Sequence, residues 1–401
     1  MNFMKKLLVL FFFMVAGYVL YSQDTKETKK PAYEFEIVKE VKTTPVKNQF
    51  RSGTCWSFSA LSFLESEMLR MGKPEVNLSE AWIIRHAYSD KAVEYVRWHG
   101  HLNFAGGGGF HDVTHTIKKY GIVPEEIYSG LNYGTEKYVH GEFDAVLKGY
   151  MDQVILNKNK ELSTAWHRGF EGILDAYFGE KPEKFTYKGK EYTPQTFAAE
   201  YTGINPDDYI EISSFTHHPY YEQFILEVPD NWMYGTVYNV TLEDFIEIID
   251  NSINKGYSVA WGGDVSEKGF SWKNGVAIVP DAEYEETSGT DKERLTGLTT
   301  KEKNEILYSF ERPLKELDIT AELRQKEFDN YKTTDDHGMH IVGIAKDQMG
   351  NKFYKVKNSW DIDNPYQGYI FMSEAFIKFK VTDIMVHKDV IPAKITKKLG
   401  L

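Results

Sequence analysis

The sequence predicts a mixed α+β fold, built as one large domain or as two lobes. Its 401 residues, 42% of them hydrophobic and 15% aromatic, are enough for a well-buried core. A helical repeat of apolar residues follows the single cysteine, Cys55, near the amino-terminal end. Two strand-like segments, 337–345 and 353–357, lie near the other end, and the loop between them predicts a hairpin.

The amino-terminal segment has the pattern of a secretory signal. Lys5 and Lys6 precede an apolar run over 7–20, and Ser22 is a small residue suited to cleavage. A retained membrane anchor is the alternative, but the run is shorter than the ~20 residues of a membrane span. We therefore expect a signal peptide at 1–23 and an exported protein, periplasmic or extracellular, with no stable membrane association after cleavage. Segment 24–44 is predicted to be a leader, 45–393 the main domain and 394–401 a short tail.

The helix that follows Cys55 places this thiol at a helix amino terminus. Phe58 and Leu61 begin an apolar repeat with steps of three and four residues, and Gly72 with Pro74 should end the helix. A helix amino terminus carries unpaired N–H groups and partial positive charge, which favour a thiolate. The thiolate is the nucleophilic form of cysteine. Cys55 is therefore a candidate nucleophile; a free cysteine that is only a small buried residue is the alternative.

The residues around Cys55 resemble the active-site signature of papain-like cysteine peptidases. The matching residues are Gln49, Gly53 and the run Cys55-Trp56-Ser57-Phe58. Ser52 stands where many secreted members have a disulfide cysteine. The absence of this cysteine resembles the bleomycin hydrolase/aminopeptidase C branch. The resemblance implies a two-lobed fold, with a helical lobe that carries the cysteine and a β-barrel-like lobe that carries a histidine and an asparagine. It also implies that Gln49 stabilises the oxyanion, that no cofactor is needed, and that peptides or proteins are the substrates.

The expected base and its orienting partner lie on the predicted hairpin. His337 begins the first strand and Asn358 follows the second, so the hairpin should bring them together. The Asn358 oxygen could then hold one ring nitrogen while the other faces Cys55. Trp360 could shield this bond from water. His340 is the rival base, but a three-residue step along a strand should turn it to the opposite face.

A run of four glycines predicts part of the substrate cleft. It lacks the Lys-Ser/Thr pair that a phosphate-binding loop needs. The resemblance implies that Gly107 and Gly108 let a substrate backbone pair along the cleft. The alternative is a plain turn before a helix at 112–120.

Several histidines raise the question of a metal site. His111 and His115 are one helical turn apart, and His99 and His101 lie nearby, but no carboxylate or cysteine ligand completes a set. We therefore predict no metal. The string around His217 and His218 resembles the bleomycin hydrolase branch, and we expect it to be structural.

The middle of the chain is longer than a minimal papain-like enzyme needs. Helical patterns over 143–156 and 165–178 suggest that 130–238 is an inserted helical region, as in the bleomycin hydrolase branch. Further on, we expect a helix over 244–255, a strand over 257–264 and a helix over 321–329.

The sequence leaves the mode of cleavage open. In the bleomycin hydrolase branch a carboxy-terminal tail lies in the cleft and makes the enzyme an aminopeptidase, and a hexameric ring is associated with the branch. This chain stops earlier, at Leu401, so the sequence predicts neither the aminopeptidase activity nor the ring. The resemblance implies an exported cysteine peptidase similar to aminopeptidase C, which hydrolyses peptide bonds through a thioester intermediate at Cys55, His337 and Asn358. An endopeptidase, a catalytically silent peptide-binding protein and an acyl transferase are the alternatives, and the resemblance is compatible with a homo-oligomer. The net charge of −12 argues against a nucleic-acid-binding protein.

Overall fold

The computed structural model describes residues 32–281 and 299–401. The predicted signal peptide therefore lies outside the described residues. Strand β1 (Phe35–Glu40) pairs with the central strand β10 (His337–Asp347). Residues 35–40 were expected in the leader but are part of the sheet, so the predicted domain start at residue 45 is wrong.

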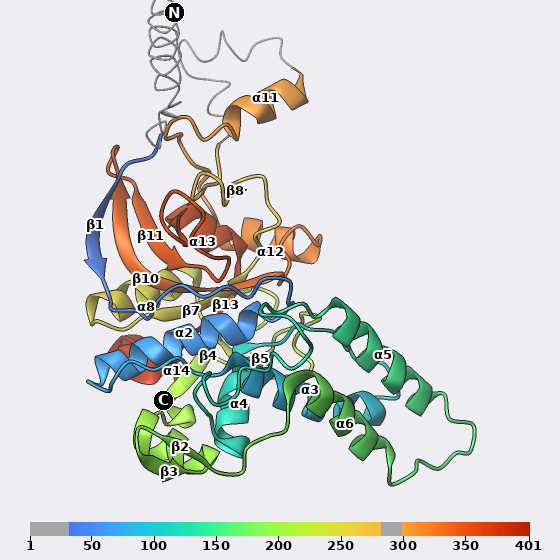
Figure 1. The fold of residues 1–401 in the computed structure, drawn as a ribbon. Coiled ribbons are helices and arrows are strands. Elements are labelled where there is room, and N and C mark those ends of the chain that lie inside the picture. The colour runs from blue at the N-terminus through green and yellow to red at the C-terminus, as the bar shows by residue number, and fades with distance from the viewer. Residues whose placement is uncertain (1–31, 282–298) are drawn as a thin grey trace, which may run out of the picture. The chain divides into compact units, whose positions relative to one another are not determined.

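One eleven-stranded sheet forms the β lobe (Figure 1). Ten strands follow the order β5-β6-β4-β13-β7-β10-β11-β12-β9-β8, and β1 pairs with β10 off this path. The remaining strands are β4 (Tyr209–Ser213), β5 (Gln223–Ile225), β6 (Thr236–Asn239), β7 (Val259–Gly263), β8 (Phe270–Ser271), β9 (Val276–Ala277), β11 (Lys352–Lys357), β12 (Tyr369–Ser373) and β13 (Val381–His387). The predicted hairpin is confirmed as β10 and β11, which pair antiparallel.

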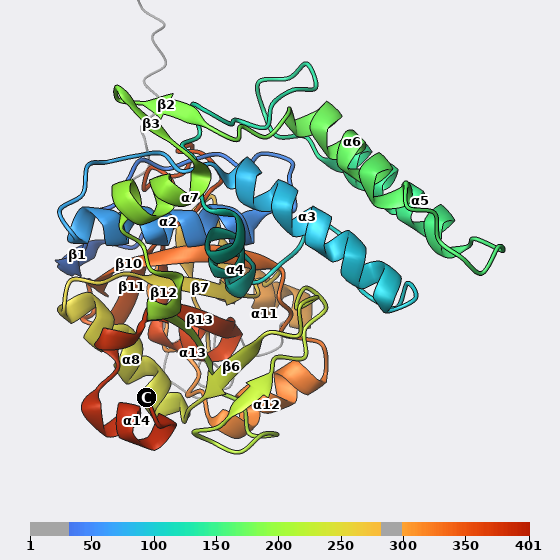
Figure 2. The same ribbon diagram turned by 90° about the horizontal axis from the view of Figure 1, so that it is seen from below.

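Helices form the other lobe, with α2 (Cys55–Arg70) between them and the sheet (Figure 2). This position explains why every residue from Trp56 to Met68 is buried, including polar ones. The other helices of this lobe are α3 (Glu80–Arg97), α4 (Phe110–Tyr120), α5 (Gly141–Ile155) and α6 (Trp166–Phe178). Their apolar faces share one core with α2, to which Phe63, Trp82 and Phe170 contribute.

The predicted insertion over 130–238 is only partly helical. Helices α5 and α6 match the expected patterns, but the hairpin of β2 (Phe185–Tyr187) and β3 (Lys190–Tyr192) follows them. After α7 (Pro194–Thr196), η1 (Phe197–Thr202) and η2 (Pro206–Asp208), strands β4, β5 and β6 join the large sheet. These strands have three to five residues each, too few for an alternating pattern to stand out.

The last third of the chain completes the β lobe. Helix α8 (Leu242–Asn254) packs against the sheet, and α11 (Thr300–Leu307), α12 (Ala321–Asp329) and α13 (Glu374–Lys380) follow. The predicted tail is wrong: after η3 (Lys388–Val390), residues 393–399 form α14 (Ala393–Leu399). Ile395 and Leu399 of this helix are buried in the core of the sheet lobe. Among the described residues, none of the helices has the length and apolar character of a membrane span.

Candidate active site

Cys55 is the first residue of α2, as the sequence predicts. The Ser57 and Phe58 N–H groups donate to the carbonyl oxygen of Thr54, which begins the helix. Cys55 is partly exposed, whereas Trp56 and Ser57, which follow it, are buried. The thiol is free, and it lines a pocket of about 550 Å³ together with His337.

His337 and Asn358 meet as predicted. The distance from His337 Nε2 to Asn358 Oδ1 is 2.8 Å. Because Oδ1 also accepts the backbone N–H of Ser359 at 2.8 Å, it is the oxygen that faces the imidazole, and Nε2–H must be the donor. Nδ1 is then the ring nitrogen left free to exchange a proton. The Trp360 ring lies 4.6 Å from the imidazole, centroid to centroid, and covers one of its faces.

A glycine lets the histidine strand rest directly on the cysteine helix. A Cβ at Gly338 would lie 2.7 Å from Ser59 Oγ and 3.4 Å from the Trp56 Cα. The first distance is shorter than real Cβ contacts, so a larger residue would require the Ser59 side chain or β10 to move. This close approach brings the side chains of Cys55 and His337 into one pocket.

The electrostatics differ from the sequence-based expectation. Burial raises the pKa of the Cys55 thiol to about 12; hydrogen bonds from the Gly338 and Trp56 backbone oppose this rise, while the nearby Asp230 charge adds to it. Burial also lowers the pKa of His337 to about 4, against the effect of the Asn358 hydrogen bond. The loss of hydration outweighs the helix terminus here. The structure thus favours a neutral thiol beside a neutral imidazole, and not the resting thiolate that the sequence predicts.

Gln49 is hydrogen-bonded to the segment that also carries Asn358. Its Oε1 accepts the Ser359 hydroxyl at 2.6 Å, and its Nε2 donates to the Ser52 carbonyl oxygen at 2.9 Å. The Gln49 backbone N–H donates to the Ser359 carbonyl oxygen at 2.9 Å. These bonds fix the orientation of the amide, and one N–H of its NH₂ group remains for another acceptor.

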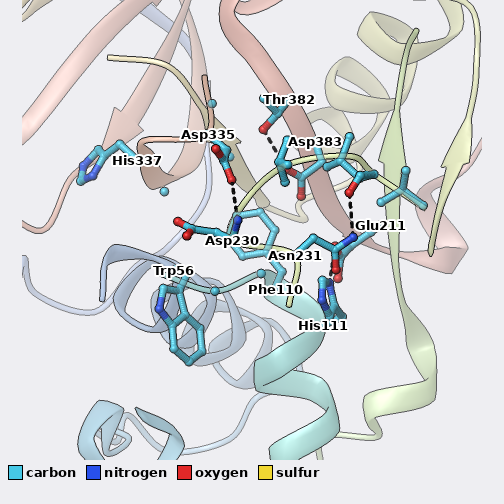
Figure 3. Close-up of a pocket in the computed structure, with 18 of the residues that line it drawn as sticks. Trp56, Phe110, His111, Glu211, Asp230, Asn231, Asp335, His337, Thr382 and Asp383 are labelled. Atoms are coloured by element: carbon cyan, nitrogen blue, oxygen red, sulfur yellow. Dashed lines mark hydrogen bonds and ion pairs between the residues drawn. The ribbon is translucent and has the colours of Figure 1, made fainter. Parts of the chain in front are cut away.

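The pocket has acidic and apolar walls that the sequence did not reveal (Figure 3). The acidic side chains are Asp230, Asp335, Asp383 and Glu211, and the apolar ones include Phe110, Leu226, Val228 and Val237. Of the two predicted cleft glycines, Gly108 lines the pocket, whereas Gly107 lies beside it against the Asp230 carboxylate. Trp360 and Gln49 are not part of this wall.

The rival base, His340, is not in this pocket. Its ring is fully buried, and its Nδ1 lies 3.0 Å from Ser62 Oγ on α2. Burial lowers its pKa far below the usual range. His340 therefore stabilises the contact between β10 and α2 as a neutral side chain.

Two of the four histidines considered as metal ligands, His111 and His115, contact carboxylates. His111 Nδ1 lies 3.1 Å from Glu211 Oε2, and His115 Nε2 lies 3.3 Å from Asp90 Oδ2. Within 32–281 and 299–401, the group with metal-like spacing is His217, His218 and Glu227. Both imidazoles bond Glu227, and His217 also bonds Gln325, so the pair ties two segments together.

Comparisons with known proteins identify the family of the chain. The model of the papain family cysteine proteases matches residues 32–171, and that of the peptidase C1-like family matches 173–296 and 299–400. The chain is 24% identical to aminopeptidase C of Lactococcus lactis subsp. cremoris, over 90% of this chain and 84% of the relative. It is also 24% identical to aminopeptidase G of Lactobacillus delbrueckii subsp. lactis, over 87% and 82% of the two chains.

The fold has a counterpart among solved structures. The crystal structure of PepW from Lactobacillus rhamnosis HN001 aligns with a TM-score of 0.67 at 20% identity, over 91% of this chain and 84% of that one. This similarity supports the two-lobed fold. Together with the family matches, it shows that the chain is a cysteine-type peptidase and belongs to the peptidase C1-like family, within the papain-like fold.

Proposed function

We propose that the chain hydrolyses peptide bonds through Cys55, His337 and Asn358, with a thioester intermediate. The observation that carries this proposal is the hydrogen bond of 2.8 Å from His337 Nε2 to Asn358 Oδ1, in an imidazole that shares a pocket with the free thiol. That bond fixes the tautomer and leaves Nδ1 to accept the thiol proton.

The first half of the reaction forms the thioester. His337 Nδ1 takes the proton from Cys55 as the sulfur attacks the carbonyl carbon of the peptide bond. When the C–N bond breaks, the imidazolium gives this proton to the leaving amine. Burial favours the neutral form of each group, and a proton transfer between them creates a close pair of opposite charges that moves no net charge into the pocket.

The second half returns the enzyme to its starting state. Water attacks the thioester carbonyl, its proton passes to His337, and the imidazolium then protonates the departing sulfur. In both halves the carbonyl oxygen becomes negative, and the free N–H of Gln49 and the backbone N–H of Cys55 are suited to stabilise it. His337 thus relays each proton of the cycle, from the thiol to the leaving amine and from water to the departing sulfur.

We further propose that the enzyme is an aminopeptidase. Relatives with this name match about nine-tenths of the chain, and the acidic pocket beside Cys55 suits a positively charged amino end. An endopeptidase of the same fold is the alternative. Export, which the amino-terminal sequence suggests, is also part of the proposal; amino-terminal sequencing of the protein from the extracellular or periplasmic fraction would test it.

The central experiment combines labelling with kinetics. An epoxide thiol inhibitor should stop turnover of a fluorogenic peptide and add one inhibitor mass, mapped to Cys55. Cys55→Ala should lower the turnover number by at least about 10⁴-fold, because the nucleophile is lost. Ser62→Ala, which removes a buried hydroxyl from the same helix, is the matched control. Full activity in the Cys55→Ala variant would overturn the proposal.

A further inference from the structure

The loop over 226–235 closes one end of the pocket that contains Cys55. At its tip, Asp230 approaches Gly107 so closely that a Cβ on this glycine would overlap the carboxylate. Asp230 Oδ1 also accepts the Asn103 side-chain amide at 2.9 Å. In Figure 3 the carboxylate is directed toward the end of the pocket that holds His337 and Trp56. Asp230 therefore occupies the space beside Gly107 that an extended substrate was expected to use.

Hydrogen bonds fix the conformation of this loop. The Asn231 side chain donates to the carbonyl oxygens of Leu226 and Gly235 at 2.8 and 2.9 Å and accepts the Gly235 N–H at 2.7 Å. The next residue, Trp232, is buried and donates its indole N–H to Asp112 Oδ2 at 2.6 Å. With both sides of its base anchored, the loop holds the Asp230 carboxylate in place.

A second carboxylate comes from the segment that directly precedes β10, the strand that begins at His337. Asp335 lines the same pocket two residues before the imidazole, and its Oδ2 accepts the Asp230 backbone N–H at 3.3 Å. Burial and the charge of Asp230 raise the pKa of Asp335 to about 7. A bound cation would relieve this repulsion.

No cation of the described chain neutralises these two carboxylates directly. Neither Asp230 nor Asp335 forms an ion pair with a described residue. Lys91 is the cation whose charge influences Asp230, but its Nζ donates to the carbonyl oxygens of Ala105 and Gly107, at 2.8 and 2.6 Å. The two acidic side chains thus face the pocket with capacity for an external positive group.

We propose that Asp230, assisted by Asp335, binds the free α-ammonium group of the peptide substrate and so limits cleavage to its amino-terminal end. The proposal rests on the proposed function, because the nucleophile in the same pocket is the evidence that a substrate lies there. Two effects act together. The anchored loop blocks a peptide chain that continues past Gly107, and the attraction of the carboxylates offsets the free energy of desolvating the ammonium group. Asp230 and Asp335 are in this sense determinants of specificity, while Cys55 and His337 do the chemistry.

The test compares pairs of fluorogenic peptides that differ only by acetylation of the α-amino group. The wild type should cleave the free-amino peptide at least about 10-fold more efficiently, as kcat/KM, than its acetylated partner. Asp230→Asn should remove most of this preference by slowing the free-amino peptide, and Asp335→Asn should weaken it less. Asp207→Asn, a surface carboxylate paired with Lys118, is the control and should keep the wild-type ratio.

A third peptide separates the two sources of an ammonium group. It is acetylated at its α-amino group and carries a lysine before the scissile bond. If Asp230→Asn slows only this peptide, the carboxylate recognises a side chain and the proposal is overturned. If the acetylated and free peptides are cleaved equally by the wild type, the proposal is also overturned, but the peptidase function stands.

The rate of alkylation of Cys55 as a function of pH guards against a misfolded variant. Because the Asp230 charge contributes to the raised pKa of the thiol, Asp230→Asn should react at lower pH than the wild type if the fold is intact. Absence of both turnover and Cys55 labelling in the wild type would instead refute the proposed function itself. If Cys55 in the Asp230→Asn variant is not labelled, the Asp230→Glu variant decides. This variant lengthens and displaces the carboxylate. If its ratio of kcat/KM for the free and the acetylated peptide equals that of the wild type, the result counts against the proposal.

Discussion

The two ends of the pocket are built in different ways. At one end, Cys55 and His337 stand on regular elements, the start of α2 and the start of β10, which lie in contact along Gly338. Asp230, which comes from a loop, lies between this end and the other, where Glu211 and Asp383 stand on β4 and β13. Chemistry thus depends on the rigid contact between the lobes, and substrate choice on side chains that can change without disturbing it. The following predictions test this division.

The largest effect is expected at the imidazole. His337→Ala should reduce kcat/KM by about 10⁴-fold for free and acetylated peptides alike, because the thiol loses its proton acceptor. His340→Asn is the matched control: it should lower stability by roughly 1–3 kcal/mol, because a buried hydrogen bond to Ser62 is lost, yet retain turnover. Comparable loss of turnover in the two variants, measured at a temperature where both are folded, would break the distinction between the two histidines.

Loss of the oxyanion donor should come next. Gln49→Ala should lower kcat by about 10²- to 10³-fold with little change in KM, because the interaction is made mainly in the transition state. The same factor is expected for both members of a peptide pair, since Gln49 lies outside the acidic pocket wall. Steady-state kinetics suffice for the measurement. A rise in KM alone would show that Gln49 serves binding and not the chemical step.

Asn358→Ala should have a smaller effect, with a pH signature. We expect a loss of roughly 10²-fold, as the imidazole is less well oriented. The Asn358 hydrogen bond raises the pKa of His337, which burial lowers to about 4. A protonated imidazole cannot accept the thiol proton, so activity should fall below about pH 4. Without Asn358 the pKa falls further, and this acid limb should move to lower pH. An upward shift would contradict the assignment of Nε2–H as the donor.

The smallest effect is expected at the far end of the pocket. Asp383→Asn should change kcat/KM for an acetylated peptide by less than about 3-fold. The substitution should instead change how the free energy of unfolding depends on pH. Burial, aided by Glu211, raises the pKa of Asp383 to about 7, so the folded state favours the protonated form and loses stability as pH rises from about 4 to 7. The variant should lose less over that range. Thermal melts of the variant and the wild type at several pH values would measure this difference. If the two melting temperatures depend on pH in the same way, the assignment to Asp383 is wrong.

The sequence predicted the catalytic end well because short, local rules determine it. Cys55 is identified by a helix start and a contiguous motif, and His337 and Asn358 by a hairpin whose strands differ clearly from their surroundings. The acidic end escaped prediction because Glu211, Asp230 and Asp383 lie far apart in sequence and no pattern marks them. Asp335, two residues before His337, could have been considered from its position alone.

The protonation state and the domain edges were missed for a physical reason as well. Whether a helix terminus ionises a thiol depends on how much water the fold removes, and the sequence does not show this burial. Strand β1 has mostly exposed side chains, so no apolar pattern distinguishes it from a leader; it becomes a strand by pairing with β10. Helix α14 is short, and its two buried residues, Ile395 and Leu399, gain significance only from the core they enter.

The chain contains a single cysteine, and it borders the pocket. A fluorinated or spin-labelled tag that reacts with thiols can therefore be placed at this position in the unaltered protein, without removing other cysteines. Its spectrum would then sense whether a small molecule enters the space beside it, and at what concentration. The same atom that we expect to cut peptides would serve, once capped, as a reporter for screening ligands by nuclear or electron resonance.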